Sequence, residues 1–185
     1  MSVLFTSDLH LGHEKILETR PFSNIEEHDK YLLSQWNLKV EPRDDIYILG
    51  DLSFRSVHGI EFYLNQMKGR KHLIIGNHDS QWIKHVDDLG KYFQSIESLA
   101  TIKYEKKKLV LCHFPMLEWS GSRYVESGTS YLIHGHIHDS KETGSYEYIK
   151  EHLPHALNAG VDINGFCPVT FEELKENNDR WYGRR

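Results

Sequence analysis

Cysteine is scarce in this chain, and its two copies, Cys112 and Cys167, stand far apart. Without a Cys-x-x-Cys spacing they indicate neither a thiolate zinc site nor a disulfide scaffold, and they fit a reducing compartment. Long apolar runs are also lacking, since none approaches the roughly 18 residues that a membrane span needs. The first residues show neither the basic region nor the long apolar stretch of a signal peptide. We therefore expect a cytoplasmic protein with no membrane partner.

A net positive charge is missing as well. The 185 residues carry 22 lysines and arginines against 27 aspartates and glutamates, which gives a formal net charge of −5. A broad nucleic-acid surface usually needs a basic face, so extended nucleic-acid binding is not expected. The length suits one domain with a sizeable core, over residues 1–185. Histidine, by contrast, is abundant, with 13 copies.

Short apolar runs and helical spacings predict the secondary structure. Strands are expected at 3–7, 46–49, 72–75, 99–104, 108–112, 131–133 and 156–162. Helices are expected from Ser23 or Asn24 to Val40, from Ser56 to Gly69, from Ser80 to Phe93 and from Thr170 to Leu174. Strands that alternate with helices in the first half indicate βαβ units. A hairpin and closely spaced strands in the second half indicate a mixed sheet.

Polar side chains that can bind metal or move protons follow the predicted strands, where each strand ends. Gly76-Asn77-His78-Asp79 comes directly after the apolar run 72–75, and Gly76 lets the backbone turn sharply there. The same arrangement recurs at four other strand ends, with Asp8 and His10, with Asp51, with His113, and with His136 and His138. Proteins of the α/β class build sites outside the carboxyl edge of the sheet, so we expect these side chains to converge.

The expected cluster combines carboxylate, amide and imidazole groups and contains no thiolate. Such a mixture suits divalent first-row ions such as Mn, Fe, Zn, Co or Ni. The candidate ligands are too many for one tetrahedral ion but suit two ions that share a carboxylate. Two-metal sites hold their ions roughly 3.5–4 Å apart and clamp both oxygens of an in-line phosphoryl displacement. Each short motif alone could be structural, but the complete ordered set predicts a dinuclear site.

In this order, the motifs resemble the signature of a known family, the calcineurin-like metallophosphoesterases. The motifs are Asp8-x-His10, Gly50-Asp51, Gly76-Asn77-His78-Asp79, His113 and Gly135-His136-x-His138. The resemblance spans residues 8–138, and residues 158–162 are similar to the closing strand of small bacterial members. It implies an α/β fold, a four-layer α/β/β/α sandwich of two mixed sheets flanked by helices, in a small single-domain member of bacterial or phage type.

The resemblance also implies ligand assignments for two divalent metal ions. The first ion would be bound by Asp8, His10 and His138, the second by Asn77, His113 and His136, and Asp51 would bridge the two. Mn is the expected metal, and family members also use Fe, Zn or Ni. A hydroxide that bridges the ions would attack phosphorus in line. His78 would stabilise the developing charge or protonate the leaving oxygen.

Further roles are expected around this centre. Asp79 would orient His78 through its second ring nitrogen, cap a helix over 80–93, or do both. Substrate contacts are expected from Asn77, His13, Arg20 and Arg55. Either arginine could hold a phosphate oxygen through a bidentate contact. The alternatives are a plain surface histidine at His13 and solvated arginines.

Two other groups of residues allow more than one interpretation. His134 shares the alternation of the ligand histidines but is not part of the family pattern, so we expect a packed or hydrogen-bonded core histidine. Trp119, Arg123 and Tyr124 lie in the loop 116–130. They could stack on a base or aromatic leaving group, or they could cover the core.

We therefore expect a dinuclear metal-dependent hydrolase of phosphoester bonds, acting on a small phosphoester or nucleotide. A phosphodiesterase is favoured over a phosphomonoesterase by resemblance alone. Two alternatives stay open: a catalytically inert metal-binding scaffold of the same fold, and a nuclease acting on short nucleic acid. His78 favours the enzyme, because inert relatives tend to lose that histidine or some ligands. The sequence leaves the physiological substrate, the metal pair and the oligomeric state open.

Overall fold

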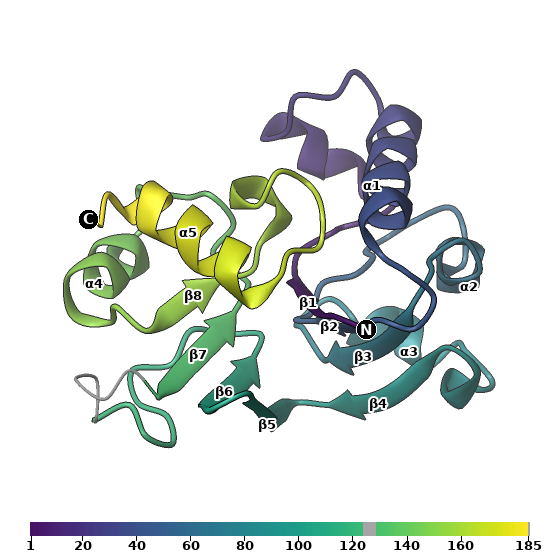
Figure 1. The fold of residues 1–185 in the computed structure, drawn as a ribbon. Coiled ribbons are helices and arrows are strands. Elements are labelled where there is room, and N and C mark those ends of the chain that lie inside the picture. The colour runs from purple at the N-terminus through teal and green to yellow at the C-terminus, as the bar shows by residue number, and fades with distance from the viewer. Residues whose placement is uncertain (124–128, 185) are drawn as a thin grey trace.

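Two four-stranded sheets form the centre of the computed structural model, which describes residues 1–123 and 129–184 (Figure 1). The first sheet has the order β1-β2-β3-β4 and is parallel throughout. Its strands are β1 (Val3–Thr6), β2 (Asp45–Ile48), β3 (Arg70–Ile74) and β4 (Phe93–Glu97). The second sheet has the order β5-β6-β7-β8, with β5 antiparallel to β6 and the other pairs parallel. Its strands are β5 (Leu99–Tyr104), β6 (Lys107–Cys112), β7 (Ser130–His134) and β8 (Ala156–Asn158).

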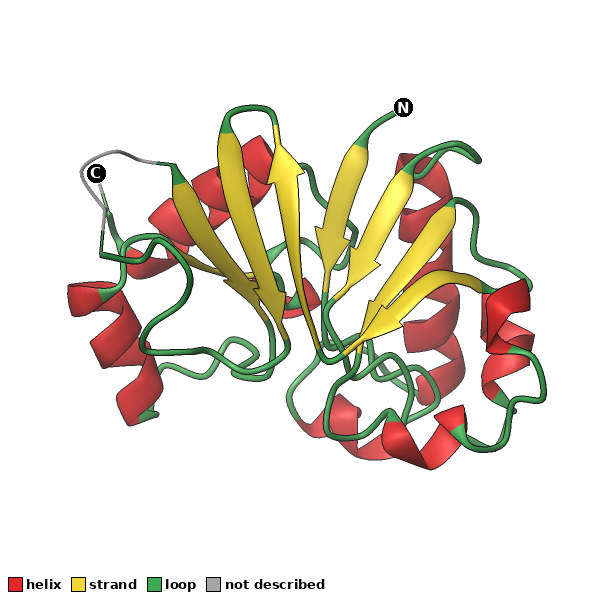
Figure 2. Cartoon of the chain, turned by 90° about the horizontal axis from the view of Figure 1, so that it is seen from below, coloured by secondary structure: helices red, strands yellow, loops and turns green. Residues whose placement is uncertain are grey.

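Helices connect the strands and cover the outer faces of the sheets (Figure 2). The α-helices are α1 (Ile25–Lys39), α2 (Ile60–Leu64), α3 (Ser80–Ile83), α4 (Gly144–His152) and α5 (Phe171–Tyr182). Short 3-10 turns are η1 (Glu14–Glu18), η2 (Leu89–Lys91) and η4 (Val161–Ile163). Two predicted caps are confirmed: Asn24 accepts the backbone N–H of Glu27, and Thr170 forms a capping box with Glu173. Within the described residues, no helix is long and apolar enough to cross a membrane.

Three apolar clusters show the predicted four layers. The central cluster joins the inner faces of both sheets, for example Phe5 and Ile74 with Leu111 and Ile133. An outer cluster packs α1 and α2 on the first sheet, and another packs α4 and α5 on the second. The expected α/β/β/α sandwich is therefore confirmed. Figure 2 shows the arrowheads of the parallel strands pointing to one edge of both sheets, which is the edge where the polar motifs follow.

The segment 80–93 departs most from the prediction. The expected long helix is wrong: α3 has four residues, and β4 begins at Phe93. Phe93, which the prediction placed at the end of this helix, instead begins the strand that pairs with β3. Pairing with a neighbouring strand can override the helix propensity of a segment, so the sequence of residues 80–93 alone does not reveal that β4 begins there.

Other helix boundaries also differ from the prediction. Ser56 is not a cap, because α2 begins at Ile60 after Gly59; its hydroxyl bonds Tyr63 instead. The last helix continues well beyond Leu174, and α4 was not expected at all. Helix α4 is held mainly by burial of Tyr146 and Ile149 under the second sheet, so tertiary packing rather than a strong local pattern forms it.

Candidate active site

The polar motifs from five strand ends meet at the carboxyl edge of the sheets. The backbone N–H of His136 donates to both carboxylate oxygens of Asp8, at 3.2 and 3.0 Å, across 128 positions of sequence. Oδ2 of Asp51 lies 3.8 Å from Nε2 of His10 and 3.5 Å from Nε2 of His113. The Nε2 atom of His78 lies 3.9 Å from the same carboxylate oxygen. Asp51 is therefore at the centre of the cluster.

Two triads in the cluster have the spacing of a metal site. Asp8, His10 and His138 each place one ligand atom within 4.8 Å of the others, and so do Asp8, Asp51 and His113. The first triad has the same members as the set predicted for the first ion. The second contains the predicted bridging residue and one predicted ligand of the second ion.

Asn77 and His136, the other two predicted ligands, lie beside His113. Oδ1 of Asn77 is 2.9 Å from Nε2 of His113, and the rings of His136 and His113 have centroids 5.1 Å apart. The Nδ1–H of His113 donates to the carbonyl oxygen of Leu49 at 2.7 Å. In the neutral ring, Nε2 is then a lone pair that faces another acceptor. Facing acceptors of this kind suit a cation.

His10 offers the clearest sign of an unmet ligand. Its side chain is buried, yet neither ring nitrogen has a hydrogen-bond partner among the described residues. Burial, together with the nearby His138 and Arg20, lowers the pKa of His10 to about 2, so its ring is neutral at physiological pH. An unpartnered buried polar atom costs about 1–3 kcal/mol. A metal ion would satisfy it, since neutral imidazole is a common metal ligand.

The carboxyl group of Asp8 is buried inside the cluster. This burial raises its pKa. Nearby His138 and His113 oppose the shift, and Asp51 adds to it. The buried carboxyl groups of Asp8 and Asp51 lie close together in this cluster, and buried negative charges require a nearby positive charge. A pair of divalent cations would supply it, so the donor set fits metal.

The backbone is strained where the candidate ligands lie. Five of the seven have positive φ angles between 49° and 73°, namely Asp8, His10, Asp51, His136 and His138. This region is uncommon for residues other than glycine, and each instance costs on the order of 1–3 kcal/mol. Strain of this kind persists at functional sites, where the surrounding structure holds the side chains in position.

Two glycines allow the ends of β2 and β3 to touch. A Cβ atom at Gly76 would lie 2.4 Å from Oδ1 of Asp51 and 2.9 Å from Cα of Gly50. A Cβ atom at Gly50, where φ is +84°, would lie 2.6 Å from Cα of Gly76. No side chain fits between the two loops, so glycine at both positions is what brings Asn77 and His78 beside Asp51.

Asp79 holds these two loops together, and it does not orient His78. One carboxylate oxygen accepts the backbone N–H groups of Asp51 and Gly76, both at 2.8 Å. The other accepts the N–H of Leu52 and the indole N–H of Trp82, both at 2.9 Å. The predicted contact with the His78 ring and the predicted side-chain cap of α3 are therefore both corrected. Buried Asp79 positions Asp51 through its backbone.

His78 lies at the open side of the cluster, with 32% of its side chain exposed. Its backbone N–H donates to Oδ1 of Asp51 at 2.9 Å, which ties it to the centre. Its ring centroid lies 4.0 Å from that of Phe54 and 5.6 Å from that of His10. The ring is thus held by packing, and it faces both the cluster and the solvent.

Arg20 is not a substrate contact, contrary to the prediction. Its side chain is buried, and all five of its N–H groups are used. The acceptors are two oxygens of Asp162 at 2.7 and 3.0 Å, the carbonyls of Leu9 and Asp8, and Nε2 of His28. None is left for a phosphate, so Arg20 fixes the loop after β1 instead.

Asp162 is the residue that sequence reasoning missed. The Nδ1–H of His138 donates to its Oδ2 at 3.0 Å, which leaves Nε2 of His138 directed at Asp8, 3.9 Å away. Burial alone would raise the pKa of Asp162, but the bond from His138 and the charge of Arg20 hold it well below its ordinary value. A carboxylate behind a metal-binding histidine fixes its tautomer and orientation. The segment 156–162 was expected to be one strand, but β8 ends at Asn158 and Asp162 lies in η4. The strand prediction gave Asp162 no role.

The other predicted residues lie at the rim or in the core. His13 packs its ring 5.5 Å from that of His10, and Arg55 is exposed nearby. His134 is confirmed as a core histidine: it is buried, and its Nδ1–H donates to the carbonyl of Gly135 at 2.9 Å. Trp119 is buried in the cluster under the second sheet, so it covers the core.

Another residue of this loop, Arg123, forms an ion pair at the surface. Exposed Arg123 pairs with Glu118 at 3.0 Å, at a surface where such pairs contribute little. Tyr124 lies outside the described residues. The predicted stacking of this loop on a substrate is therefore unsupported at the two positions described.

Known proteins resemble this chain over nearly its whole length. "Gene 66 protein" of Mycobacterium phage L5 is 33% identical over 185 residues, which cover 87% of this chain and 86% of that protein. "Uncharacterized protein MJ1445" of Methanocaldococcus jannaschii is 30% identical over 174 residues, with 92% and 87% covered. A crystal structure of the protein of unknown function AQ665 from Aquifex aeolicus matches with a TM-score of 0.71 at 26% identity, covering 94% of this chain and 97% of that one.

The family assignment comes from a match to the model of a protein family. Residues 1–160 match the calcineurin-like phosphoesterase superfamily domain. This span contains all five strand ends that form the cluster, and the observed two-sheet fold agrees with it. The chain therefore belongs to the calcineurin-like phosphoesterase superfamily, and it is a metal-dependent phosphoesterase.

Proposed function

We propose that this phosphoesterase is a dinuclear phosphodiesterase that acts on small substrates, with Mn²⁺ as its ion. The observation that carries the proposal is the buried ring of His10, unpartnered at both nitrogens, beside the carboxylates of Asp8 and Asp51. Neither nitrogen of the His10 ring has a hydrogen-bond partner in the described part of the chain. Mixed imidazole and carboxylate ligands suit a first-row divalent ion.

The geometry supports the predicted division of ligands between two ions. The first ion would be held by Asp8, His10 and His138, the second by Asn77, His113 and His136, and Asp51 would be shared. The central place of the Asp51 carboxylate, within 4 Å of histidines from both sets, supports its bridging role. The acceptor pair formed by Asn77 and His113 supports a second ion beside the first.

The protein's own groups supply binding, orientation and a proton. When bound, two divalent ions make hydroxide available near neutral pH and offset charge on the phosphoryl oxygens. Asn77 is exposed beside the cluster and would hold a phosphoryl oxygen through its amide N–H. His78, protonated, would stabilise charge on the phosphoryl group or donate a proton to the leaving oxygen. Phe54 fixes the ring of His78 for this task.

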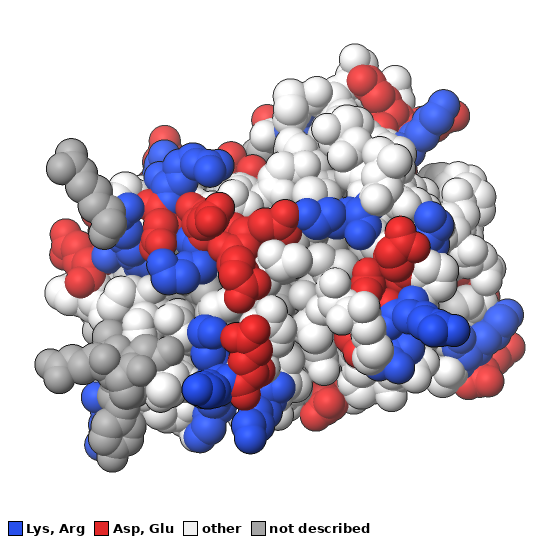
Figure 3. Space-filling model, in the orientation of Figure 1, with Lys and Arg blue, Asp and Glu red and all other residues white. Residues whose placement is uncertain are grey.

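The preference for a diester draws on the openness of the site. A diester has two organic groups, and both need room beside the phosphorus. Asn77 and His136 are exposed and His78 is half-buried, so the cluster opens on the side where substrate would enter. Acidic and basic side chains are interspersed over the face shown in Figure 3, with lysines gathered near β5 and β6. The formal net charge of −5 favours a small substrate over a long nucleic acid.

Metal dependence and substrate type can be tested together. Protein stripped with EDTA should not hydrolyse bis-p-nitrophenyl phosphate, and Mn²⁺ should restore turnover, because the centre supplies the nucleophile only when loaded. p-Nitrophenyl phosphate should be the poorer substrate. Nitrophenolate release in the presence of Mn²⁺, Ni²⁺ or Zn²⁺ measures the metal dependence and the preference between the two substrates. Tight metal uptake without turnover of either compound would instead identify the inert scaffold.

Asp162 gives a second test of the ligand assignment. Asp162→Ala should weaken Mn²⁺ binding by about 10–100-fold, because His138 loses the group that orients it. Isothermal titration of the metal-free protein with Mn²⁺ measures this without any reaction. Asp139→Ala is the matched control, since Asp139 is exposed and adjacent to His138 in sequence. Equal affinities for the two variants would contradict the role of His138 as a ligand.

A further inference from the structure

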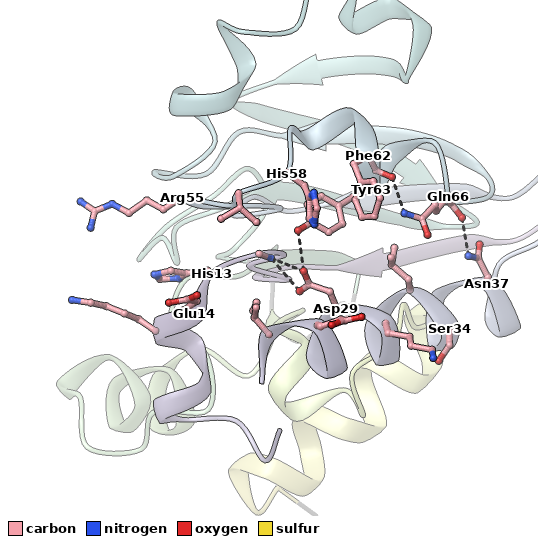
Figure 4. A pocket seen from close by; sticks show the side chains of 17 residues that line it. His13, Glu14, Asp29, Ser34, Asn37, Arg55, His58, Phe62, Tyr63 and Gln66 are labelled. Carbon is pink, nitrogen blue, oxygen red and sulfur yellow. Dashed lines mark hydrogen bonds between the residues drawn. The ribbon is translucent and has the colours of Figure 1, made fainter. Parts of the chain in front are cut away.

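A groove lies between α1 and the segment 55–66, outside the candidate centre (Figure 4). It has a volume of about 860 Å³, within the range of small-molecule sites. In Figure 4, Asp29, Ser34 and Asn37 of α1 line one side, and His58, Phe62 and Gln66 line the other. Only some of these groups are free to bind a ligand.

The floor of the groove has its hydrogen bonds satisfied internally. Asp29 accepts the N–H of Gly12 at 2.9 Å, the hydroxyl of Tyr63 at 2.9 Å and the Nδ1–H of His28 at 2.8 Å. With these donors in place, the carboxylate needs no cation. The groove is therefore not another metal site, and its ligand must be recognised by its walls and its ends.

One end of the groove borders the candidate centre. The ring of His13, which lines the groove, lies 5.5 Å from that of His10 and 4.9 Å from that of Phe54. Phe54 in turn contacts His78, with ring centroids 4.0 Å apart. A substrate with its phosphate at the centre can thus extend into the groove past His13.

Charged side chains gather at this end of the groove, namely Glu14, Lys15 and Arg55. Arg55 is exposed and has no carboxylate partner among the described residues; its guanidinium lies 5.0 Å from the ring centroid of Phe54. Figure 4 shows Arg55 and His13 extending towards the same end. The φ angle of Arg55 is +50°, a conformation that is uncommon for this residue type. An exposed guanidinium without a carboxylate partner, close to a phosphoesterase centre, suits an anionic oxygen.

The outer part of the groove presents flat apolar surface to the solvent. The rings of His58 and Phe62 stack with centroids 4.4 Å apart and an interplanar angle of 23°. Phe62 is 50% exposed, and neighbouring Val57 is 89% exposed. Such a stack offers a platform for another ring, and stacking on an aromatic side chain contributes about 1–3 kcal/mol per base.

We propose that the groove binds the nucleoside part of a nucleotide diester whose reacting phosphate lies at the metal centre. The proposal rests on the phosphodiesterase function proposed above and adds its substrate class. The base stacks on Phe62 and His58, and Arg55 holds a non-reacting oxygen of the phosphate or ribose. The volume of the groove is sufficient for a nucleoside. Outward from the metal centre, Arg55 comes before the aromatic pair, just as the phosphate and ribose of a nucleotide come before the base.

The test compares two diesters with the same leaving group. Methyl p-nitrophenyl phosphate has no base, whereas thymidine 5′-(p-nitrophenyl phosphate) has one. The wild-type protein with Mn²⁺ should show a kcat/KM at least about tenfold higher for the thymidine compound, and Phe62→Ala should reduce this ratio about tenfold. Tyr148→Ala is the matched control: Tyr148 is 46% exposed on α4 and also contacts a histidine ring, that of His152.

The outcomes separate the two proposals. If the wild-type protein hydrolyses neither diester, the proposed function fails. If it hydrolyses both with equal kcat/KM, or if Phe62→Ala keeps the wild-type ratio, the groove assignment alone is overturned. A ratio that falls in Phe62→Ala and not in Tyr148→Ala supports the nucleoside site, and circular dichroism confirms that both variants are folded.

Discussion

Replacement of His78 by alanine is expected to lower kcat by about 10²–10⁴-fold while both metal sites stay filled. The ring lies at the open side of the centre, and its Nε2 atom is 3.9 Å from Asp51, farther than a direct hydrogen bond. Its loss therefore removes a group that faces substrate but none of the seven proposed ligands. Steady-state kinetics and metal analysis of the same preparation measure the two effects.

Two comparisons make this prediction sharper. His85→Ala is the control, because His85 is an exposed histidine just after α3 and should change neither value. A leaving group that departs without a proton, such as p-nitrophenolate, separates the two roles proposed for His78. Proton donation predicts a larger loss with a nucleoside leaving group than with p-nitrophenol, whereas charge stabilisation predicts equal losses. Loss of metal from His78→Ala would mean that His78 is itself a ligand.

The convergence of the candidate ligands could be predicted from sequence, because it depends on local motifs and on strand topology. Each candidate ligand follows directly after a strand, and parallel strands deliver their carboxyl ends to one edge. The order of motifs along the chain therefore sufficed to bring Asp8 beside His136. The glycines of the Gly50-Asp51 and Gly76-Asn77 motifs were also informative. Gly50 and Gly76 can approach each other closely because neither residue has a Cβ atom.

The roles of Arg20, Asp79 and Asp162 could not be predicted, because each depends on a partner set by tertiary structure. Arg20 and Asp162 are 142 positions apart, and no local pattern relates them. Asp79 stands next to His78 in sequence, but its carboxylate turns inward to the backbone of the β2 loop. Nearness in sequence suggested a contact with the His78 ring, whereas four N–H donors nearby determined where the side chain lies.

The buried ion pair of Arg20 and Asp162 should contribute strongly to the free energy of unfolding. Arg20→Met leaves the Asp162 carboxylate buried beside two unpaired carbonyls, and breaking a buried pair in this way costs about 3–5 kcal/mol. Urea denaturation of the metal-free protein measures the loss. Arg70→Met is the control: Arg70 also contacts both oxygens of an aspartate, Asp45, but its side chain is 46% exposed, so a much smaller loss is expected.

A double-mutant cycle decides whether Arg20 stabilises the fold through its ion pair with Asp162 or through its bonds to backbone carbonyls. In Arg20→Met with Asp162→Asn, no buried charge is left alone, so the double variant should be more stable than the sum of the single losses predicts, with a coupling of about 1–3 kcal/mol. Additive losses would mean that Arg20 acts by its bonds to the carbonyls of Asp8 and Leu9 alone. Coupling would instead join the loop after β1 to the turn after β8 through one ion pair. The same pair would then hold Asp8 and His138 in register before any ion binds, because Arg20 contacts the backbone of one and Asp162 the ring of the other.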